Sequence, residues 1–301
     1  MKHIHWLLPF APNQDVSTVH IASARLRAGL FKDLPNYNVT YGYDVGRCDI
    51  LMVGKIGVNV TDLTDLWIDI IKRHENVIFD FTDDHLNNIT PMTRFYRSVV
   101  KKDSMIVVSS QKMKETLKDY DNVYVVEDPY EIEIMPIQRP NNRFLWYGHP
   151  TNVKYLYKLL ERLEPSSKIE LTVMTSESML DVIMKDNVPM HKNVKAQLVP
   201  WSLKNMVLSY DCGILIPGDV NDIKKSGVSS NRLLTAFAMG CAVCATPYDS
   251  YKEFSDYFCD IDNVNEFVDN PEPYLQKTKE AQQLITKYSK EEMLKKWIRL
   301  L

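Results

Sequence analysis

A polar, basic loop followed by an apolar helix is the part of this chain best suited to chemistry. Lys224 and Lys225 precede mostly small residues at 226–231, Arg232 follows, and the apolar run 233–239 ends at Gly240. The first backbone N–H groups of such a helix can bind an anion, and the two lysines add positive charge. The pattern therefore predicts a phosphate site. The alternatives are that Ser229, Ser230 and Asn231 cap the helix, and that the lysines lie in a solvated loop.

Three further residues are candidates for the same ligand. Arg232 falls in the first turn of the predicted helix, where a cation opposes the helix dipole, and this misfit favours an anionic partner. His149 follows a predicted strand, where it can contact a diphosphate or serve a structural role. Trp201 follows Pro200, where its ring can stack on a base or pack in the core.

A carboxylate and an imidazole lie just past another predicted strand. Asp83, Asp84 and His85 follow the apolar run 76–81. They can orient a hydroxyl group and take its proton, or they can cap a helix. Asp84 and His85 are the catalytic candidates.

Four other charged residues precede these in the chain. Asp15 and His20 lie near the exit of the first predicted strand. Arg25 and Arg27 lie on a predicted helix and either face a binding cleft or form a basic surface stripe.

Composition limits the function classes. A chain of 301 residues favours two domains, and a net charge of -3 argues against a general polyanion-binding surface while allowing a local basic patch. No signal peptide and no apolar run of about 20 residues is evident, so we expect a cytoplasmic protein without a membrane span. Five cysteines fit reduced thiols. Cys241 and Cys244 are either buried strand residues or a redox or zinc pair.

Apolar strands alternate with amphipathic helices along the chain. The first series comprises strands at 4–9, 38–41, 49–54, 76–81, 105–108 and 123–126, with helices at 18–31, 62–73, 92–100 and 112–117. The alternation lapses at 131–142, which is the predicted linker. The second series comprises strands at 143–148, 169–173, 194–199, 211–217 and 241–246, with helices at 153–163, 179–184 and 232–239 and two more within 274–301.

Two such series predict an α/β protein with two Rossmann-like domains facing across a cleft. The expected division is 1–137 for the acceptor-side domain and 138–285 for the nucleotide-binding domain. A C-terminal helix at 286–301 packs back on the first domain.

The order of these motifs resembles the GT-B glycosyltransferases. Residues 231–243 (NRLLTAFAMGCAV) are similar to the donor-loop helix of that family, and Trp146, Tyr147, Gly148 and His149 with Lys154 look like the entry to its donor domain. Ser23, Arg25 and Arg27 match a Ser-x-Arg-x-Arg helix of many bacterial members. The stretches 79–85, 127–130 and 211–217 and the closing helices also fit the family's pattern.

The resemblance implies transfer of a sugar from a nucleoside diphosphate sugar, here most simply a UDP-sugar, to a hydroxyl acceptor. Its donor contacts map to His149, Lys154, Trp201, Lys224, Lys225, Ser229, Ser230, Asn231, Arg232 and Thr235. No bound cofactor or metal is needed if cationic side chains and helix N–H groups hold the diphosphate. The acceptor is a saccharide or, alternatively, a modified base of DNA.

One departure from the family pattern concerns the donor loop. Retaining members carry two glutamates across it, and Gly227 and Thr235 stand at those positions. A non-catalytic nucleotide-sugar-binding protein is therefore a third reading. The sequence does not set the oligomeric state.

Overall fold

The computed structural model describes residues 1–10, 15–16, 19, 21–56, 61–90, 92–177, 191–222, 225 and 227–301. The chain divides into two compact units. Unit 1 comprises Met1–Asp128, Ile223–Ser229 and Lys290–Leu301, and unit 2 comprises Pro129–Asp222 and Ser230–Ser289.

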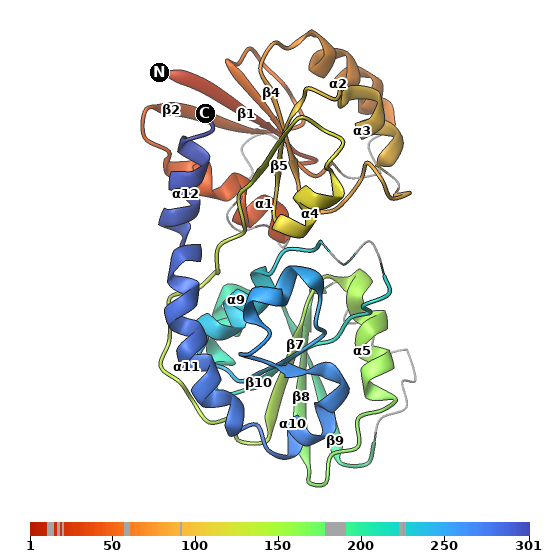
Figure 1. Ribbon diagram of the computed structural model, residues 1–301, viewed down its shortest axis with the longest axis vertical. Coiled ribbons are helices and arrows are strands. Elements are labelled where there is room, and N and C mark those ends of the chain that lie inside the picture. The colour runs from red at the N-terminus through yellow and green to blue at the C-terminus, as the bar shows by residue number, and fades with distance from the viewer. Residues whose placement is uncertain are drawn as a thin grey trace. The chain divides into compact units, whose positions relative to one another are not determined.

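Unit 1 is built on a six-stranded sheet in which every pair of neighbouring strands is parallel (Figure 1). The strand order is β2-β1-β3-β4-β5-β6. The strands are β1 (Lys2–Leu7), β2 (Tyr37–Gly42), β3 (Ile50–Val53), β4 (Val77–Phe81), β5 (Met105–Val108) and β6 (Asn122–Val125). Central strands such as β3 are buried throughout, as expected where helices cover both faces of a parallel sheet.

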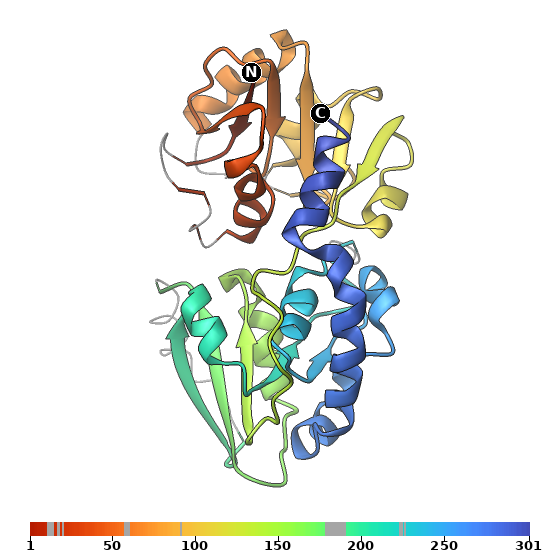
Figure 2. The same ribbon diagram turned by 90° about the vertical axis from the view of Figure 1, so that its left-hand side faces the viewer.

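Helices cover both faces of this sheet. On one face, α2 (Thr61–Arg73) and α3 (Thr93–Val99) pack a core that includes Trp67, Phe79 and Tyr96. On the other, η1 (Ala28–Asp33) and the last helix α12 (Lys290–Ile298) lie against β1 (Figure 2). The rings of Trp6, Phe31 and Trp297 meet edge to face with centroids 5.1–6.0 Å apart. The prediction that the chain returns to the first domain is therefore confirmed.

A buried ion cluster holds α1 (Ala22–Leu26) to the sheet. Arg27 is fully buried and donates to Asp80 at 2.6 Å and to Asp128 at 2.9 Å. Its guanidinium also lies 5.2 Å from the ring of Trp297. Burial opposes the charge, but the two carboxylates raise the pKa of Arg27 above its usual value. Both readings of Arg27 as a cleft or surface residue were wrong, because the side chain is an internal counterion.

Unit 2 carries a second six-stranded sheet of parallel neighbours, in the order β12-β11-β10-β7-β8-β9. The strands are β7 (Arg143–Tyr147), β8 (Ile169–Thr175), β9 (Val194–Pro200), β10 (Gly213–Ile216), β11 (Val243–Ala245) and β12 (Cys259–Asp260). Two parallel sheets with flanking helices confirm the predicted fold class.

The two faces of this sheet are covered by different helices. α5 (Val153–Leu160) and α10 (Val264–Asp269) pack a core that includes Phe144, Trp146 and Phe267. α9 (Asn231–Ala238) lies on the opposite side of the sheet from α5, with α11 (Pro273–Ile285) against it (Figure 1).

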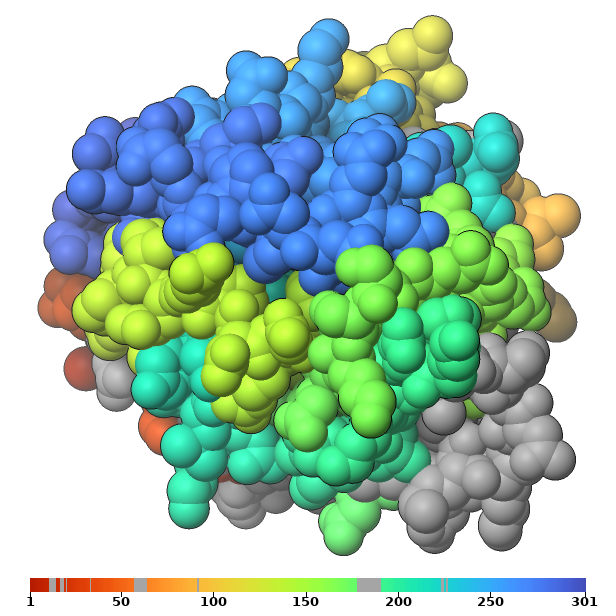
Figure 3. All heavy atoms as spheres, turned by 90° about the horizontal axis from the view of Figure 1, so that it is seen from below, coloured from red at the N-terminus to blue at the C-terminus, as the bar shows by residue number. Residues whose placement is uncertain are grey.

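The predicted linker has no regular structure and lies along unit 2. Figure 3 shows the yellow-green segment around residue 140 beside the blue C-terminal helices on this face. The backbone N–H of Met135 donates to the carbonyl of Ala238 at 2.7 Å, and Gln282 donates to the carbonyl of Met135 at 2.8 Å. Gly240 has φ +75°, and a Cβ there would lie 2.5 Å from the carbonyl oxygen of Pro136. A glycine is therefore needed at this contact.

Two predicted elements differ from the structure or fall outside it. The helix predicted over 18–31 is divided into α1 and η1 at Arg27, whose side chain turns into the ion cluster. The helix predicted over 179–184 lies outside the described residues. The described helices are completed by α4 (Gln111–Thr116), α7 (Leu203–Leu208), η2 (Pro150–Asn152), η3 (Asp249–Phe254), η4 (Ile261–Asn263) and η5 (Thr286–Tyr288). The elements α7, η3, α10 and β12 had not been predicted. Among the described residues, no helix is long and apolar enough to cross a membrane.

Candidate functional site

The strand order of unit 2 reverses between β7 and β10. One half of the sheet runs β7-β8-β9 and the other β10-β11-β12. In open parallel sheets, ligands bind beyond the carboxyl ends of the strands at such a reversal. Gly148 follows β7 and Pro217 follows β10, so the candidate site in unit 2 lies at these residues.

Arg232 occupies this position at the amino end of α9. Its guanidinium donates to the carbonyl of Tyr147 at 3.2 Å, and the Tyr147 hydroxyl donates back to the carbonyl of Arg232 at 2.6 Å. A Cβ on Gly148 would lie 3.2 Å from the guanidinium. The strand end and the helix start are thus fastened together, with a cation held between them.

Two tyrosines after β11 complete the surroundings of Arg232. Tyr251 is buried and its hydroxyl is hydrogen-bonded to Arg232; burial raises the pKa of Tyr251 although Arg232 acts in the other direction. Burial also raises the pKa of Tyr248 to about 12, so both phenols are neutral at physiological pH. The Tyr248 hydroxyl accepts the N–H of Asp219 at 3.2 Å, and a Cβ on Gly218 would collide with it.

The first turn of α9 contains the other predicted donor contacts. Ser230 is the N-cap residue of α9, as the capping alternative had it, but its side chain makes no capping hydrogen bond. Asn231 is half-buried at the helix start. Thr235 is 1% exposed, and its hydroxyl accepts the N–H of Glu131 at 3.2 Å. A ribose contact by Thr235 stays a prediction, because this hydroxyl already holds the linker segment.

The remaining predicted donor residues each contact a different part of the protein. His149 is exposed and its Nδ1 lies 3.0 Å from the Thr151 hydroxyl, at the start of η2. The Lys154 ammonium lies 4.7 Å from the ring centre of Tyr155 on α5. Trp201 is half-buried, and its backbone N–H donates to the carbonyl of Thr175 at 2.7 Å. None of these contacts assigns a ligand, so their binding roles stay predictions.

The loop before α9 is only partly described. Lys224 lies outside the described residues. Residues 223–229, which include Lys225 and Ser229, group with unit 1. There the Ser110 hydroxyl donates to the carbonyl of Gly227 at 2.8 Å.

An ion pair marks the carboxyl edge of the unit 1 sheet. Lys55, just past β3, contacts Asp83, just past β4, at 2.5 Å. Burial by itself would raise the pKa of Asp83, but Lys55, followed by Lys225 and His85, lowers it to about 2. Asp83 is therefore an ionised carboxylate at neutral pH, and its side chain is 28% exposed.

His85 lies beside this pair. Its ring stacks on Tyr96 with centroids 5.2 Å apart, and its Nδ1 lies 3.0 Å from the Thr90 hydroxyl. Burial lowers the pKa of His85 to about 4, so the imidazole is neutral at pH 7. In the tautomer in which Nδ1 donates to Thr90, Nε2 is the nitrogen that can accept a proton.

Asp84 and Tyr96 position these groups. Asp84 Oδ1 accepts the N–H groups of Leu86 and Asn87, and Oδ2 accepts from Asn88, which closes the turn after β4. Asp84 thus closes a turn and does not cap a helix, and a direct catalytic role for it stays a prediction. The Tyr96 hydroxyl donates to the carbonyl of Gly54 at 2.7 Å and accepts the N–H of Ile56 at 3.3 Å. It therefore fixes the backbone on both sides of Lys55.

Sequence reasoning missed Lys55, Tyr96 and Tyr251. Lys55 could have been found as the first charged residue after a buried strand. The two tyrosines carried no signal, because their partners are distant in the chain.

The other candidates have the following surroundings. Arg25 is 8% exposed and donates to the carbonyl of Val19 at 2.6 Å. Asp15 pairs with Lys32 at 3.2 Å, and His20 lies outside the described residues. Cys241 and Cys244 are buried and free, with Cys241 donating to the carbonyl of Tyr210. Among the described residues, no group of three or more His, Cys, Asp or Glu side chains could hold a metal ion.

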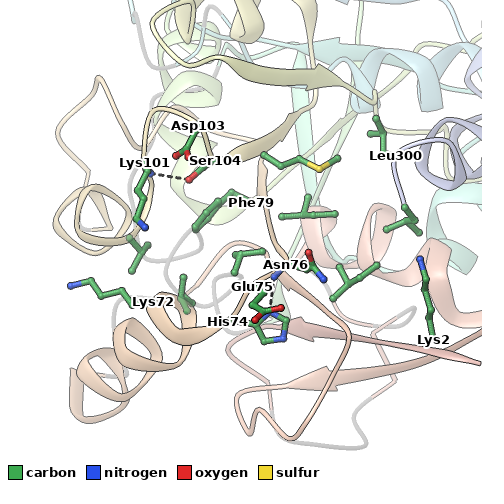
Figure 4. Close-up of a pocket in the computed structure, with 17 residues that line it drawn as sticks. Lys2, Lys72, His74, Glu75, Asn76, Phe79, Lys101, Asp103, Ser104 and Leu300 are labelled. Atoms are coloured by element: carbon green, nitrogen blue, oxygen red, sulfur yellow. Dashed lines mark hydrogen bonds between the residues drawn. The ribbon is translucent and has the colours of Figure 1, made fainter.

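A separate cavity of about 480 Å³ lies at the opposite, amino edge of the unit 1 sheet (Figure 4). It is lined by the first residues of four strands, Lys2, Ile50, Val77 and Met105, and by the C-terminal Leu300 and Leu301. Since ligands of parallel sheets bind at the carboxyl edge, this cavity is not the candidate site.

Comparison with solved structures identifies the fold. HepE of Anabaena in complex with UDP is 10% identical, with a TM-score of 0.61 over 100% of this chain and 99% of HepE. T4 phage BGT in complex with UDP and Mn²⁺ is 13% identical, with a TM-score of 0.59 over 99% of each chain. TarM is 11% identical with a TM-score of 0.54, and the match spans 83% of this chain but only 54% of TarM.

No family model matches the chain, and a search of curated proteins found no match. The fold is that of the GT-B glycosyltransferases, as the sequence resemblance predicted.

Proposed function

We propose that this protein transfers a sugar from a UDP-sugar to a hydroxyl group of its acceptor. The observation that carries this proposal is Arg232, a cation at the amino end of α9 beside the strand-order reversal of unit 2. That position combines backbone N–H groups, the positive end of a helix and a guanidinium, all of which suit a diphosphate. The UDP bound to HepE and to T4 phage BGT supports uracil as the base.

The diphosphate is held by α9 and its flanking residues. Arg232 and the N–H groups near Ser230 and Asn231 bind its oxygens. These groups stabilise the negative charge that builds on UDP as the sugar leaves. We expect UDP binding to survive a metal chelator, because side chains supply the countercharge.

Transfer requires a proton acceptor for the incoming hydroxyl. The bond between the sugar carbon and the diphosphate oxygen breaks, the acceptor oxygen bonds to that carbon, and the hydroxyl proton leaves. We assign that proton to the neutral imidazole of His85, whose protonated form the ionised carboxylate of Asp83 would stabilise. Asp84 shapes the turn that presents them.

Thermal shift with a nucleotide panel tests the donor. UDP and a UDP-sugar should raise the melting temperature, whereas GDP, ADP and CMP at equal concentration should not, since only a ligand of the folded state stabilises it. No shift with any uridine nucleotide would contradict the proposal.

Kinetics of two variants test the acid–base assignment. Asp83→Asn and His85→Gln should each lower turnover by about 10²–10⁴-fold while leaving the UDP shift intact. Asp121→Asn is the control, since this carboxylate is 58% exposed beside Lys102. Wild-type turnover in both site variants would remove the assignment. UDP binding without any turnover in the wild type would favour the non-catalytic reading.

The acceptor hydroxyl belongs to a saccharide or to a base of DNA. The second candidate is supported by end-to-end similarity to β-glucosyltransferase, described as a DNA modifying enzyme, with a TM-score of 0.57 over 99% of this chain and 98% of that one. Transfer assays with oligosaccharides and with DNA whose bases carry a hydroxyl group distinguish the two.

A further inference from the structure

A second cavity in unit 1 borders the turn that carries His85. It measures about 570 Å³ and is lined by Ile89, Thr90, Thr93, Arg94, Arg97 and Ser98. Thr90 joins it to the candidate site, because its hydroxyl lies 3.0 Å from His85 Nδ1. A molecule in this cavity would therefore lie next to the proposed acceptor position.

The lining of this cavity is positively charged. Its lining includes two guanidinium groups and no carboxylate. Arg97 is fixed by the bond from its Nε to the carbonyl of Leu86 at 2.8 Å, and Arg94 is exposed. The lining thus carries two positive charges, against a net charge of -3 for the whole chain. The asymmetry favours an anionic partner.

An aliphatic side chain projects beside these cations. Ile89 is 82% exposed, more than any other large hydrophobic residue of the described chain except Met1. The backbone on both sides of Ile89 is fixed by Thr93, whose hydroxyl donates to the carbonyl of Asn88 at 2.7 Å and accepts the N–H of Thr90 at 2.8 Å. The turn thus presents Ile89 to solvent in a fixed place.

We propose that this surface docks duplex DNA, with Arg94 and Arg97 on phosphates and Ile89 inserted between base pairs. Arginines bind backbone phosphates, and apolar side chains wedged into a base step unstack it. A base must leave the stack to reach an enzyme site at a sheet edge. A polymer of sugar phosphates has the charge but no stacked bases, so it gives Ile89 no role. The inference rests on the proposed function and selects DNA as its acceptor.

Fluorescence anisotropy with a short labelled duplex tests the charge contacts. Wild-type protein should bind, with an affinity that falls steeply with salt. The double variant Arg94→Ala, Arg97→Ala should bind at least about 10-fold more weakly, with a salt slope lower by about two. The matched control is Arg73→Ala, an arginine at the end of α2 whose side chain is 81% exposed, and it should bind as the wild type does.

A duplex containing 2-aminopurine tests the wedge. Unstacking brightens this base, so wild-type protein should raise its fluorescence and Ile89→Ala should not, while retaining the Arg94 and Arg97 contacts. Equal brightening of 2-aminopurine by Ile89→Ala would overturn the proposal. It would also be overturned if inorganic polyphosphate bound as tightly as the duplex and Ile89→Ala had no effect on either affinity. If UDP stabilises the protein but no duplex binds, the docking inference fails and the proposed function stands. If UDP has no effect, the proposed function itself fails.

Discussion

At the residue scale, the candidate site depends on charges held by partners that are remote in sequence. Lys55 keeps Asp83 ionised, and Tyr96 fixes both Lys55 and the ring of His85. In unit 2, Arg232 is placed by Tyr147 and Tyr251. Each of these candidate site residues is therefore held in place by a partner residue that is remote in sequence.

The lowered pKa of His85 predicts a pH dependence of stability. The unfolded imidazole takes a proton near pH 6.5, whereas the folded one does so only near pH 4. The unfolded state therefore binds the extra proton between these values, and stability should fall as pH drops from 6.5 to 4, by up to about 3 kcal/mol. Urea unfolding across this range measures it. An equally steep loss in His85→Gln would assign the effect to other groups.

Removal of the buried cation in unit 1 should be costly. Arg27→Met leaves Asp80 and Asp128 buried without a counterion, and we expect a loss of about 3–5 kcal/mol in the free energy of unfolding. Arg73→Met, at an exposed pair with Asp69, should change it by less than about 0.5 kcal/mol. Similar urea midpoints for the two variants would contradict this account of Arg27.

At this scale, the sequence signal for a candidate site residue was its position just after a predicted strand. It singled out Asp83 and His85, because parallel sheets bind ligands at their carboxyl edge, whereas Arg232 was singled out by its place in the first turn of a helix. It did not supply the partners, which come from other strands and helices. The sequence also placed Arg27 wrongly. A helical pattern cannot show that a cation meets carboxylates 53 and 101 residues away.

At the element scale, alternation of apolar and amphipathic runs was enough to predict the described strands except β12. The short elements between 249 and 269 were missed because runs of two to six residues carry little periodicity. The break between α1 and η1 was missed for a different reason. There, the ion cluster outweighs a continuous helical pattern.

The contact between Gly240 and the linker predicts a position intolerant of side chains. Gly240→Ala combines a positive φ with a Cβ 2.5 Å from the Pro136 carbonyl, so it should cost at least about 1–2 kcal/mol. Gly46→Ala, where a Cβ would meet nothing within 4 Å, is the matched control and should be near neutral. Chemical denaturation of both variants checks the difference, and equal stabilities would show that the linker yields to the added methyl group.

At the scale of the whole molecule, the chain forms two sheets and then returns to the first. The returning helix α12 completes the core of unit 1 through Trp297, which is 0% exposed. The last residues of the chain thus belong to the same unit as the first.

Truncation of this anchor should destabilise unit 1. Trp297→Ala removes a buried ring that contacts Trp6 and Phe31, and we expect a loss of about 3–5 kcal/mol. Ile298→Ala, at the adjacent residue with 42% exposure, should cost much less. Thermal unfolding distinguishes them, and a stable Trp297→Ala would mean that α12 contributes little to unit 1.

The most direct test of the proposed donor site is calorimetric titration of UDP into wild-type protein and into Arg232→Ala. The account predicts binding by the wild type, and a 10- to 100-fold weaker affinity in the variant, which corresponds to the loss of a charged hydrogen bond of about 1.5–3 kcal/mol. Arg139→Ala, at an arginine of unit 2 that is 79% exposed, should bind as the wild type does. Equal UDP affinity in wild type and Arg232→Ala, with both proteins folded, would contradict the central claim.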